Sequence, residues 1–268
     1  QGVPGAYSEQ AIYQYLGKET NTYPCRGFSD MFQAVQDGTA PHALLPVENS
    51  LAGTVIPAYD QLVDHDLHLQ AEYIFRVQHC LMAPKGTAVS DITQVKSHYQ
   101  ALGQCERTLK RMRIEPIVYY DTGAARDLAE TPEPKTAAIA SALAAETYGL
   151  EILVRNLEDL DFNFTRFFLL GMEEPPRHDP SKTSIILTTR HTPGALYSVM
   201  TELANEGINL TKLESRPRRN RPWHYLFYVD FEGHIDDPHV QRAMIQELKK
   251  AAFLKVLGSY PAATMPKT

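Results

Sequence analysis

In residues 163–170 a hydroxyl and a guanidinium stand next to each other, because Thr165 and Arg166 precede an apolar run that begins at Phe167. Successive side chains of an extended segment point to opposite faces. Thr165 and Phe167 are therefore expected on one face and Arg166 on the other. A buried arginine is costly without an anion. One interpretation is an anion site, and the other is an edge strand whose Arg166 pairs with a surface carboxylate.

A second polar group follows an apolar segment at residues 43–47, where Glu48, Asn49 and Ser50 lead into a helix expected through residue 63. The strand ends of open α/β sheets are where such folds bind ligands. Asn49 or Ser50 is also a suitable cap for that helix. Capping and ligand binding are compatible here, and both are expected.

Two further helix starts carry polar side chains. Residues 2–8 form a loop with Gly and Pro, and Ser8 is expected to cap the helix after it. Such a loop presents backbone N–H groups to an anion. Ser97 and Gln100 fit a capping box, which gives both a sufficient structural role. His98 falls in the first helical turn, where the helix dipole disfavours its cationic form.

Composition excludes several classes of protein. The chain has 268 residues, 43% of them hydrophobic and 22% charged, as is usual for a soluble globular protein with one large domain or two. Its net charge of -6 argues against a nucleic-acid partner, which requires a basic face. No stretch reaches the apolar length of a membrane span, so no membrane contact is expected.

The cysteines and histidines suggest neither a disulfide framework nor a metal site. Cys25, Cys80 and Cys105 lack metal-ligand or redox spacing and are expected as free thiols in a reducing cytoplasm. The 10 histidines are scattered, so no metal is expected. No secretion signal opens the chain. Gln1 is not an initiator and leads directly into a loop, which indicates a short first strand missing ahead of it.

The order of apolar and polar segments divides the chain. Up to residue 172 a strand, a polar loop and a helix recur, which predicts parallel α/β lobes. Hydroxyls and amides at the strand ends are expected to meet in a cleft that suits a small oxygen-rich anion bound without metal. Residues 173–182 are Pro-rich and polar and read as a linker. Residues 183–268 show the order β-α-β-β-α-β, the ferredoxin-like split motif.

Taken together, these segments resemble prephenate dehydratase with a C-terminal ACT regulatory domain. The matching catalytic segments are Gly2-x-x-Gly5-Ala-Tyr-Ser8-Glu9, Pro46-Val-Glu48-Asn49-Ser50-x-x-Gly53-Thr-Val55, Ser97-His98-x-Gln100-Ala-Leu-x-Gln104-Cys105 and Asn163-x-Thr165-Arg166-Phe167. The matching regulatory segments are Pro193-Gly194-Ala195-Leu196, Gly207-Ile208-Asn209-Leu210 and Glu214-Ser215-Arg216-Pro217. One departure is Asp121-Thr122, where the family usually has Ser-Thr, because it adds a carboxylate.

The resemblance implies an architecture and a reaction. The catalytic domain, residues 1–172, would be two-lobed like type II periplasmic binding proteins, with lobe one at 1–78 and 162–172 and lobe two at 79–161. The ACT domain would occupy 183–268. The implied reaction in the interlobe cleft converts prephenate to phenylpyruvate, carbon dioxide and water, with no cofactor, in a cytoplasmic enzyme of phenylalanine biosynthesis.

The resemblance also implies roles for single residues. Thr165 is the candidate donor to the departing hydroxyl and Arg166 the candidate carboxylate clamp. A threonine hydroxyl is a poor general acid, so the proton donor stays open between Thr165, His98 and Glu48. The expected substrate-binding residues are Ser8, Glu48, Asn49, Ser50, Ser97, His98, Gln100, Thr122, Asn163 and Phe167. Phe167 is expected to pack below the site, because a strand aromatic is more often a core residue than a contact.

The C-terminal resemblance implies an effector site shared between chains of a homodimer or homotetramer. L-Phenylalanine is the expected effector. The expected site residues are Gly194, Ala195, Leu196, Asn209, Leu210, Glu214, Ser215 and Arg216. From the residues alone, the preferred interpretation is that Gly194 is a turn and Arg216 a solvated strand residue.

Three alternatives remain open at the level of sequence. Arogenate dehydratase keeps the chemistry and replaces the keto group of the substrate with an amino group. A non-catalytic two-lobed protein that binds small anions or amino acids is a different class. A nucleic-acid-binding regulator is the most remote, because the basic cluster at residues 216–221 reads as a solvated hairpin loop.

Overall fold

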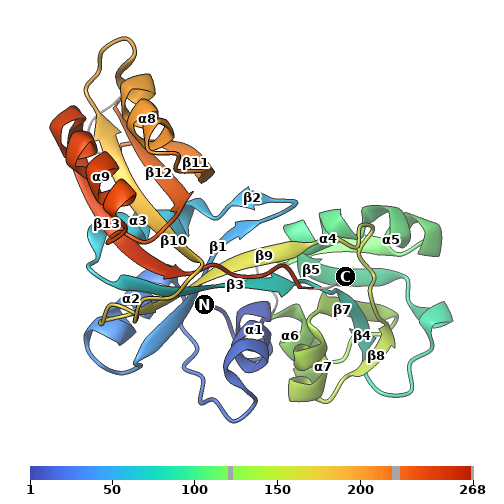
Figure 1. Cartoon of the computed structure of the whole chain (residues 1–268). Coiled ribbons are helices and arrows are strands. Elements are labelled where there is room, and N and C mark those ends of the chain that lie inside the picture. Colours follow the sequence, from blue (N-terminus) through green and yellow to red (C-terminus); the bar gives the residue numbers. More distant parts are fainter. Residues whose placement is uncertain (120–122, 219–223, 267–268) are drawn as a thin grey trace.

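Three β-sheets, each with its own helices, organise the part of the chain that the computed structural model describes, residues 1–119, 123–218 and 224–266 (Figure 1). In chain order the elements are α1 (Tyr7–Leu16), α2 (Phe28–Gln36), β1 (His42–Asn49), β2 (Gly53–Thr54), α3 (Ile56–Asp64), β3 (His68–Arg76), β4 (Cys80–Ala83), η1 (Val89–Asp91), β5 (Gln94–His98), α4 (Tyr99–Gln104), α5 (Glu106–Met112), β6 (Glu115–Tyr119), α6 (Ala124–Glu130), β7 (Thr136–Ala140), α7 (Ala142–Tyr148), β8 (Glu151–Val154), β9 (Phe164–Gly171), β10 (Ser181–Thr189), α8 (Ala195–Asn205), β11 (Leu210–Pro217), β12 (Tyr225–Glu232), α9 (Pro238–Lys250) and β13 (Ala251–Pro261).

The first lobe contains a four-stranded sheet in the order β2-β1-β9-β3. Strand β9 lies between β1 and β3 and is antiparallel to both. The prediction of a parallel sheet is therefore wrong for this lobe. The chain leaves the lobe after β3 and returns only at β9, so β9 is not joined to its neighbours by the strand–helix–strand crossover that parallel pairing requires.

The two faces of this sheet have different coverings. On one face, Ala11 of α1 packs with Leu44, Phe75 and Phe167. On the other face, the apolar side chains of α2 and α3 pack with Phe168 and with the C-terminal domain. Strand β9 is therefore covered on both sides, and adjacent β9 residues enter different environments.

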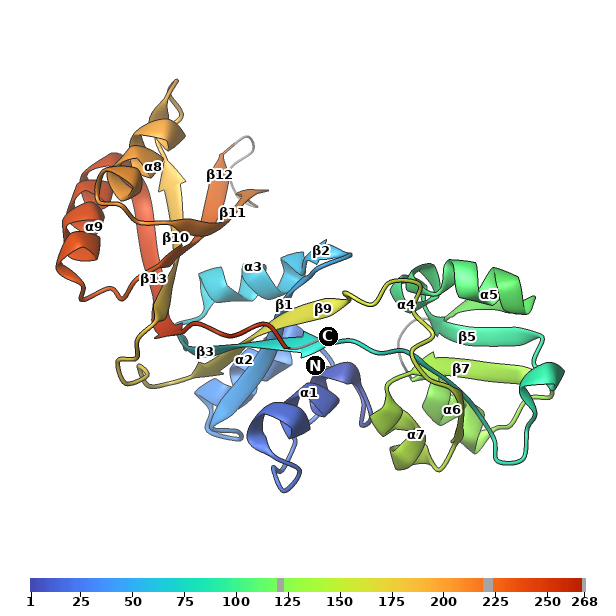
Figure 2. The same cartoon turned by 45° about the vertical axis from the view of Figure 1, so that its right-hand side comes forward.

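The second lobe has a five-stranded sheet in the order β6-β5-β7-β4-β8. Its β5 is parallel to β6 and β7, whereas β4 is antiparallel to β7 and β8, so this sheet is mixed. Figure 2 shows two connections between the lobes, one from β3 to β4 and one from β8 to β9.

The C-terminal domain has the predicted β-α-β-β-α-β order, with an antiparallel sheet in the order β11-β12-β10-β13. One face of this sheet is covered by α8 and α9. The other face places Ile186, Tyr228 and Tyr260 in the same core cluster as α2 and α3. The second lobe and the C-terminal domain thus lie at opposite ends of the first lobe (Figure 1). The expected architecture of two α/β lobes with a ferredoxin-like domain is confirmed.

Three predicted helix caps are wrong. Helix α3 begins at Ile56 with Val55 as N-cap, so neither Asn49 nor Ser50 caps it. Helix α1 begins at Tyr7 with Ala6 as N-cap, so Ser8 lies inside its first turn. Strand β5 continues through His98, which becomes the N-cap of α4, with Nδ1 accepting from the Gln100 amide at 3.4 Å. Ser97 is therefore a strand residue. None of the helices within the described ranges is both long and apolar enough to cross a bilayer.

Candidate active site

A cavity of about 530 Å³ lies between the two lobes. The first lobe contributes residues from the start of α1, the β1–β2 hairpin, the start of α3 and β9. The second-lobe side contributes the connection at His79 and helix α4. Its lining residues with hydrogen-bonding side chains are Gln1, Tyr7, Ser8, Asn49, Thr54, His79, His98, Tyr99, Gln100, Gln104 and Thr165.

Thr165 and Phe167 line this cavity, whereas Arg166 does not. The alternation of an extended strand explains the difference, and the expectation for these three residues is confirmed. Phe167 is also buried against α1 and forms an edge contact with Phe75 at a centroid distance of 6.2 Å. It is therefore both a wall of the cavity and a core residue.

Asn49 fixes the orientation of the Thr165 hydroxyl. Asn49 Oδ1 accepts backbone N–H groups of the next turn, at 2.9 Å from Ala52, so its Nδ2 must point toward β9. There Nδ2 approaches three acceptors at 2.8–3.1 Å, which are Asn163 Oδ1, a backbone carbonyl and Thr165 Oγ1. Amide nitrogen only donates. Thr165 Oγ1 is therefore the acceptor, and its own proton is left to point elsewhere, including into the cavity it lines.

Further hydrogen bonds extend this network across the lobes. Asn163 Nδ2 donates to Gln104 Oε1 at 2.8 Å, and His79 Nε2 lies 2.7 Å from the same oxygen. A carbonyl oxygen only accepts, so His79 must carry its proton on Nε2. The other ring nitrogen then accepts from the Tyr7 hydroxyl at 2.5 Å.

His79 and Tyr7 are both neutral in this network. Burial lowers the pKa of His79, which is only 2% exposed, and burial raises the pKa of Tyr7 well above its ordinary value. Since Gln104 Oε1 already accepts two hydrogen bonds, the side-chain group of Gln104 that remains for the cavity is its amide nitrogen.

The cavity wall is suited to an anion despite having few charges. Among the described residues that line it there is no lysine or arginine. Two helices begin at the cavity wall. Helix α1 contributes Tyr7 and Ser8, and helix α3 contributes Ile56 and Pro57. Helix N-termini carry partial positive charge and free N–H groups. An anion at this wall would therefore be held by helix ends, hydroxyls and amides.

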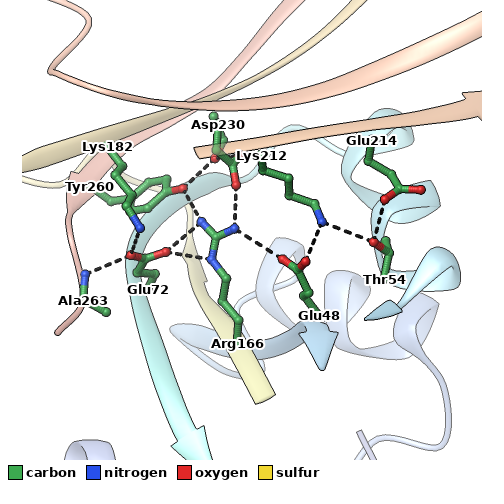
Figure 3. Close-up of polar contacts among 11 residues, drawn as sticks. Glu48, Thr54, Glu72, Arg166, Lys182, Lys212, Glu214, Asp230, Tyr260 and Ala263 are labelled. Atoms are coloured by element: carbon green, nitrogen blue, oxygen red, sulfur yellow. Dashed lines mark hydrogen bonds and ion pairs between the residues drawn. The ribbon is translucent and has the colours of Figure 1, made fainter. Parts of the chain in front are cut away.

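Arg166 occupies the opposite face of β9, and its guanidinium is enclosed by partners from two domains (Figure 3). Its Nε donates to Glu72 at 2.7 Å, its Nη1 to Asp230 at 2.5 Å and its Nη2 to Tyr260 at 3.1 Å. Burial disfavours the charge, but Asp230, Tyr260 and Glu72 outweigh it and raise the pKa of Arg166 above its ordinary value. The expectation that Arg166 clamps a substrate carboxylate is contradicted by this arrangement.

Three other expected substrate contacts have structural partners instead. Glu48 points to the same interdomain network as Arg166, with Oε1 3.1 Å from Lys212 Nζ, and does not line the cavity. Ser50 Oγ donates to the Phe162 carbonyl at 2.7 Å and accepts from the Phe164 amide, so it fastens the hairpin to the start of β9. Ser97 Oγ donates to the Ile139 carbonyl at 2.7 Å inside the second sheet.

The remaining expected contacts fall into three groups. Ser8, Asn49, His98 and Gln100 line the cavity together with Thr165. Asn163 is fully buried just behind it and acts through Asn49 and Gln104. Thr122 lies outside the described residues.

Six of the cavity residues with hydrogen-bonding side chains were not predicted, namely Gln1, Tyr7, Thr54, His79, Tyr99 and Gln104. The sequence signal for Gln104 is its position four residues after Gln100, since residues at that spacing share one helix face. The signal for His79 is its position directly before β4, where the chain crosses to the second lobe.

A second cavity, of about 310 Å³, lies in the C-terminal domain and is lined by the expected Gly194, Ala195 and Leu196. Its other walls are Thr189, Arg190, His191, Thr192, Tyr197, His224, Tyr225 and Phe227. Gly194 has φ of 77°, a left-handed conformation that suits glycine, and precedes the first turn of α8.

The other expected effector residues are elsewhere. Asn209 and Ser215 are exposed, and Leu210 packs on the core of the domain. Glu214 accepts from Thr54 at 2.9 Å, and Arg216 binds Asp60, so both contact the first lobe and not this cavity.

Comparisons with known proteins agree with this architecture. The prephenate dehydratase family model matches residues 1–175, and the ACT domain model matches residues 183–248. Arogenate dehydratase 1 of Petunia hybrida is 42% identical over 99% of this chain and 67% of its own length. The chloroplastic arogenate dehydratase/prephenate dehydratase 2 of Arabidopsis thaliana is 41% identical over 98% of this chain and 72% of its own length.

Two solved structures are also similar. The structure described as GqqA, a novel type of quorum quenching acylase, superposes with a TM-score of 0.91 at 37% identity, covering 98% of this chain and 97% of that one. The prephenate dehydratase of Arthrobacter aurescens in complex with L-Phe superposes with a TM-score of 0.89 at 28% identity, covering 99% of this chain and 91% of that one. The chain belongs to the prephenate dehydratase family, a family of lyase-type dehydratases, and carries a C-terminal ACT domain.

Proposed function

We propose that this chain converts prephenate to phenylpyruvate, carbon dioxide and water. In this reaction the bond from the ring to its carboxylate breaks, and the electron pair moves through the diene to expel the hydroxyl at the opposite ring carbon. The departing oxygen takes up one proton to become water, and the ring becomes aromatic. Atoms and electrons balance without an oxidant or reductant.

The observation that supports this proposal most is the orientation of Thr165. Its Oγ1 accepts from Asn49 at 3.1 Å, so its proton is available to the cavity. A hydrogen-bond donor aimed at an oxygen that gains negative charge stabilises the transition state more than the ground state. Thr165 would therefore stabilise the leaving hydroxyl, and the Asn49 bond would strengthen its donor character by polarisation.

The rest of the wall fits the other parts of the substrate. Phe167, Val55 and Phe28 supply an apolar surface for the ring. The N-terminal residues of α1 and α3 and the amide of Gln104 are the candidates for holding the two carboxylates.

Arogenate is the second candidate substrate, and the curated relatives named as arogenate dehydratases support it. It differs from prephenate by an amino group in place of the side-chain keto group. The chemistry at the ring is the same, so Thr165 would act in the same way. The product would be phenylalanine in place of phenylpyruvate.

Amide hydrolysis is a third candidate, raised by the similarity to the structure described as an acylase. A hydroxyl nucleophile requires an adjacent base. Among the described residues, the recorded side-chain partner of the Thr165 hydroxyl is an amide donor, not a base. The geometry therefore favours dehydration.

One experiment separates these candidates. The purified chain is incubated separately with prephenate, with arogenate and with an N-acyl amide, and phenylpyruvate, phenylalanine and the released acid are measured by chromatography. Phenylpyruvate formation from prephenate at the highest kcat/KM supports the proposal. Turnover of the amide alone, or of no substrate, would refute it.

We also propose that L-phenylalanine binds the cavity of the ACT domain and regulates the enzyme. The support is the pairing of aromatic walls, Tyr225 and Phe227, with the turn at Gly194 and the first residues of α8. The similar Arthrobacter aurescens protein was solved with L-Phe. Titration calorimetry with L-phenylalanine, with L-alanine as control, tests binding. Light scattering tests the dimer or tetramer expected for a shared site.

A further inference from the structure

We propose that Lys212, on the ACT domain, is a positioning residue for the substrate cavity, because it holds the cavity residue Thr54 in place from the outside. This inference rests on the proposed function for its kinetic test. Lys212 lies on β11, in a different domain from the cavity it would support. Figure 3 shows its side chain reaching down to the hairpin formed by β1 and β2.

Thr54 connects the two domains through one hydroxyl. Lys212 Nζ donates to Thr54 Oγ1 at 3.2 Å, and Thr54 Oγ1 donates to Glu214 at 2.9 Å. Lys212 and Glu214 are two residues apart on β11 and so share one face of that strand. The hydroxyl is thus held from both sides by the ACT domain, while Thr54 itself lines the cavity.

The hairpin that carries Thr54 is held mainly at its turn and at β1. Strand β2 has two residues, which pair with Glu48 and Asn49 of β1, and the Val55 amide donates to the Val47 carbonyl at 2.9 Å. The Thr54 side chain has its hydrogen bonds with β11. The contacts from β11 therefore fix the side chain that this short strand presents to the cavity.

The burial of Lys212 shows that its position is tightly determined. Its side chain is only 7% exposed, and its Nζ lies 3.1 Å from Glu48 Oε1 and 5.5 Å from the centre of the Tyr59 ring. A buried ammonium is tolerated only where it is paired and hydrogen-bonded. Glu48 meets that need, and it directly precedes Asn49, the residue that orients Thr165. Lys212 thus contacts both strands of the hairpin.

Lys182 offers a matched control on the same interface. It lies on β10 of the C-terminal sheet, is 21% exposed and binds a buried glutamate of the first lobe, Glu72, at 2.7 Å. Neither Lys182 nor Glu72 lines the cavity. Loss of the Lys182 charge should therefore affect the interface but not the wall formed by Thr54.

The experiment compares K212M, K182M, T54V and the double variant K212M/T54V in the full-length chain. K212M is expected to raise KM about 5-fold or more, with a smaller change in kcat, since the wall is loosened but Thr165 is intact. K182M is expected to leave KM within about 2-fold. If Lys212 acts through Thr54, the double variant K212M/T54V should have nearly the same KM as T54V alone. The effects of two substitutions in one hydrogen-bond network are not additive.

Hydrogen exchange supplies a readout that does not depend on turnover. K212M should speed the exchange of residues 48–55, and K182M should not. The inference is overturned if K212M leaves the exchange of residues 48–55 unchanged or leaves KM unchanged. It is also overturned if the KM increase of K212M/T54V equals the product of the increases of the two single variants. A wild-type chain that turns over no substrate refutes the proposed function alone, because the exchange comparison still decides the role of Lys212.

Discussion

Replacing Thr165 with valine tests the proposed reaction most directly, because valine keeps the shape of the side chain and removes only the hydroxyl. Thr165 Oγ1 accepts one bond from Asn49 and offers its proton to the cavity. Losing one preorganised donor to a developing negative charge lowers kcat by roughly 100- to 1,000-fold, about 2.7–4 kcal/mol. KM should change much less, since the bond to the leaving oxygen strengthens mainly in the transition state.

The assay is steady-state formation of phenylpyruvate from prephenate, with thermal unfolding measured in parallel. The conservative control is Thr165→Ser, which keeps the donor and the Asn49 bond and should retain activity within about 10-fold of wild type. The reasoning is refuted if Thr165→Val keeps kcat within about 3-fold of wild type. It is equally refuted if Thr165→Ser loses as much kcat as Thr165→Val while both variants remain folded.

Three further changes test neighbouring parts of the structure. N49D keeps the Oδ1 acceptor but replaces the donor, so the Thr165 hydroxyl should turn to the new carboxylate, and kcat should fall at least 10-fold with an unchanged far-UV spectrum. R166M should leave Asp230 buried without its cation and lower the free energy of unfolding by about 3–5 kcal/mol in urea titrations; a loss of substrate affinity in a fully stable variant would contradict this. Burial raises the pKa of Glu247 to about 8, above the ~4.3 of an exposed glutamate. Between these two pH values the folded chain therefore binds one more proton than the unfolded chain. The free energy of unfolding then falls as the pH rises from the lower value to the higher. E247Q should therefore gain stability over wild type between pH 5 and pH 8, measured by urea unfolding at both values, and parallel curves would refute the assignment.

The local geometry of β9 was predictable from sequence, but what covers its far face was not. Alternation alone separates Thr165 from Arg166, and the structure confirms it. The partner of Arg166 depends on Asp230, 64 residues later, and on how the ACT domain packs on the first lobe. Nothing in the pattern around Arg166 distinguishes a carboxylate of a substrate from a carboxylate of the same chain.

The same limit explains the residues that the sequence did not identify. His79, Gln104 and Tyr7 meet only because the two lobes fold against each other, and each alone is an ordinary polar residue near a strand or helix end. Helix starts were more accessible from sequence, yet Ser97 was misplaced as a cap. A Ser followed three residues later by Gln fits a capping box, but strand pairing with β6 and β7 extends β5 and moves the helix start to Tyr99.

The hydrogen-bond network between the lobes also bears on how closure of the cleft would affect catalysis. Asn163 lies on the connection from the second lobe to β9, Gln104 belongs to the second lobe, and Asn49 belongs to the first. A rotation of one lobe relative to the other would stretch the bond between Gln104 and Asn163 or the bond between Asn163 and Asn49. The bond from Asn49 to Thr165 lies within the first lobe and would be kept, because Asn49 Oδ1 is held by backbone N–H groups of its own hairpin. Closure of the cleft would therefore bring Gln104 and the second-lobe wall to a Thr165 donor whose orientation is already set.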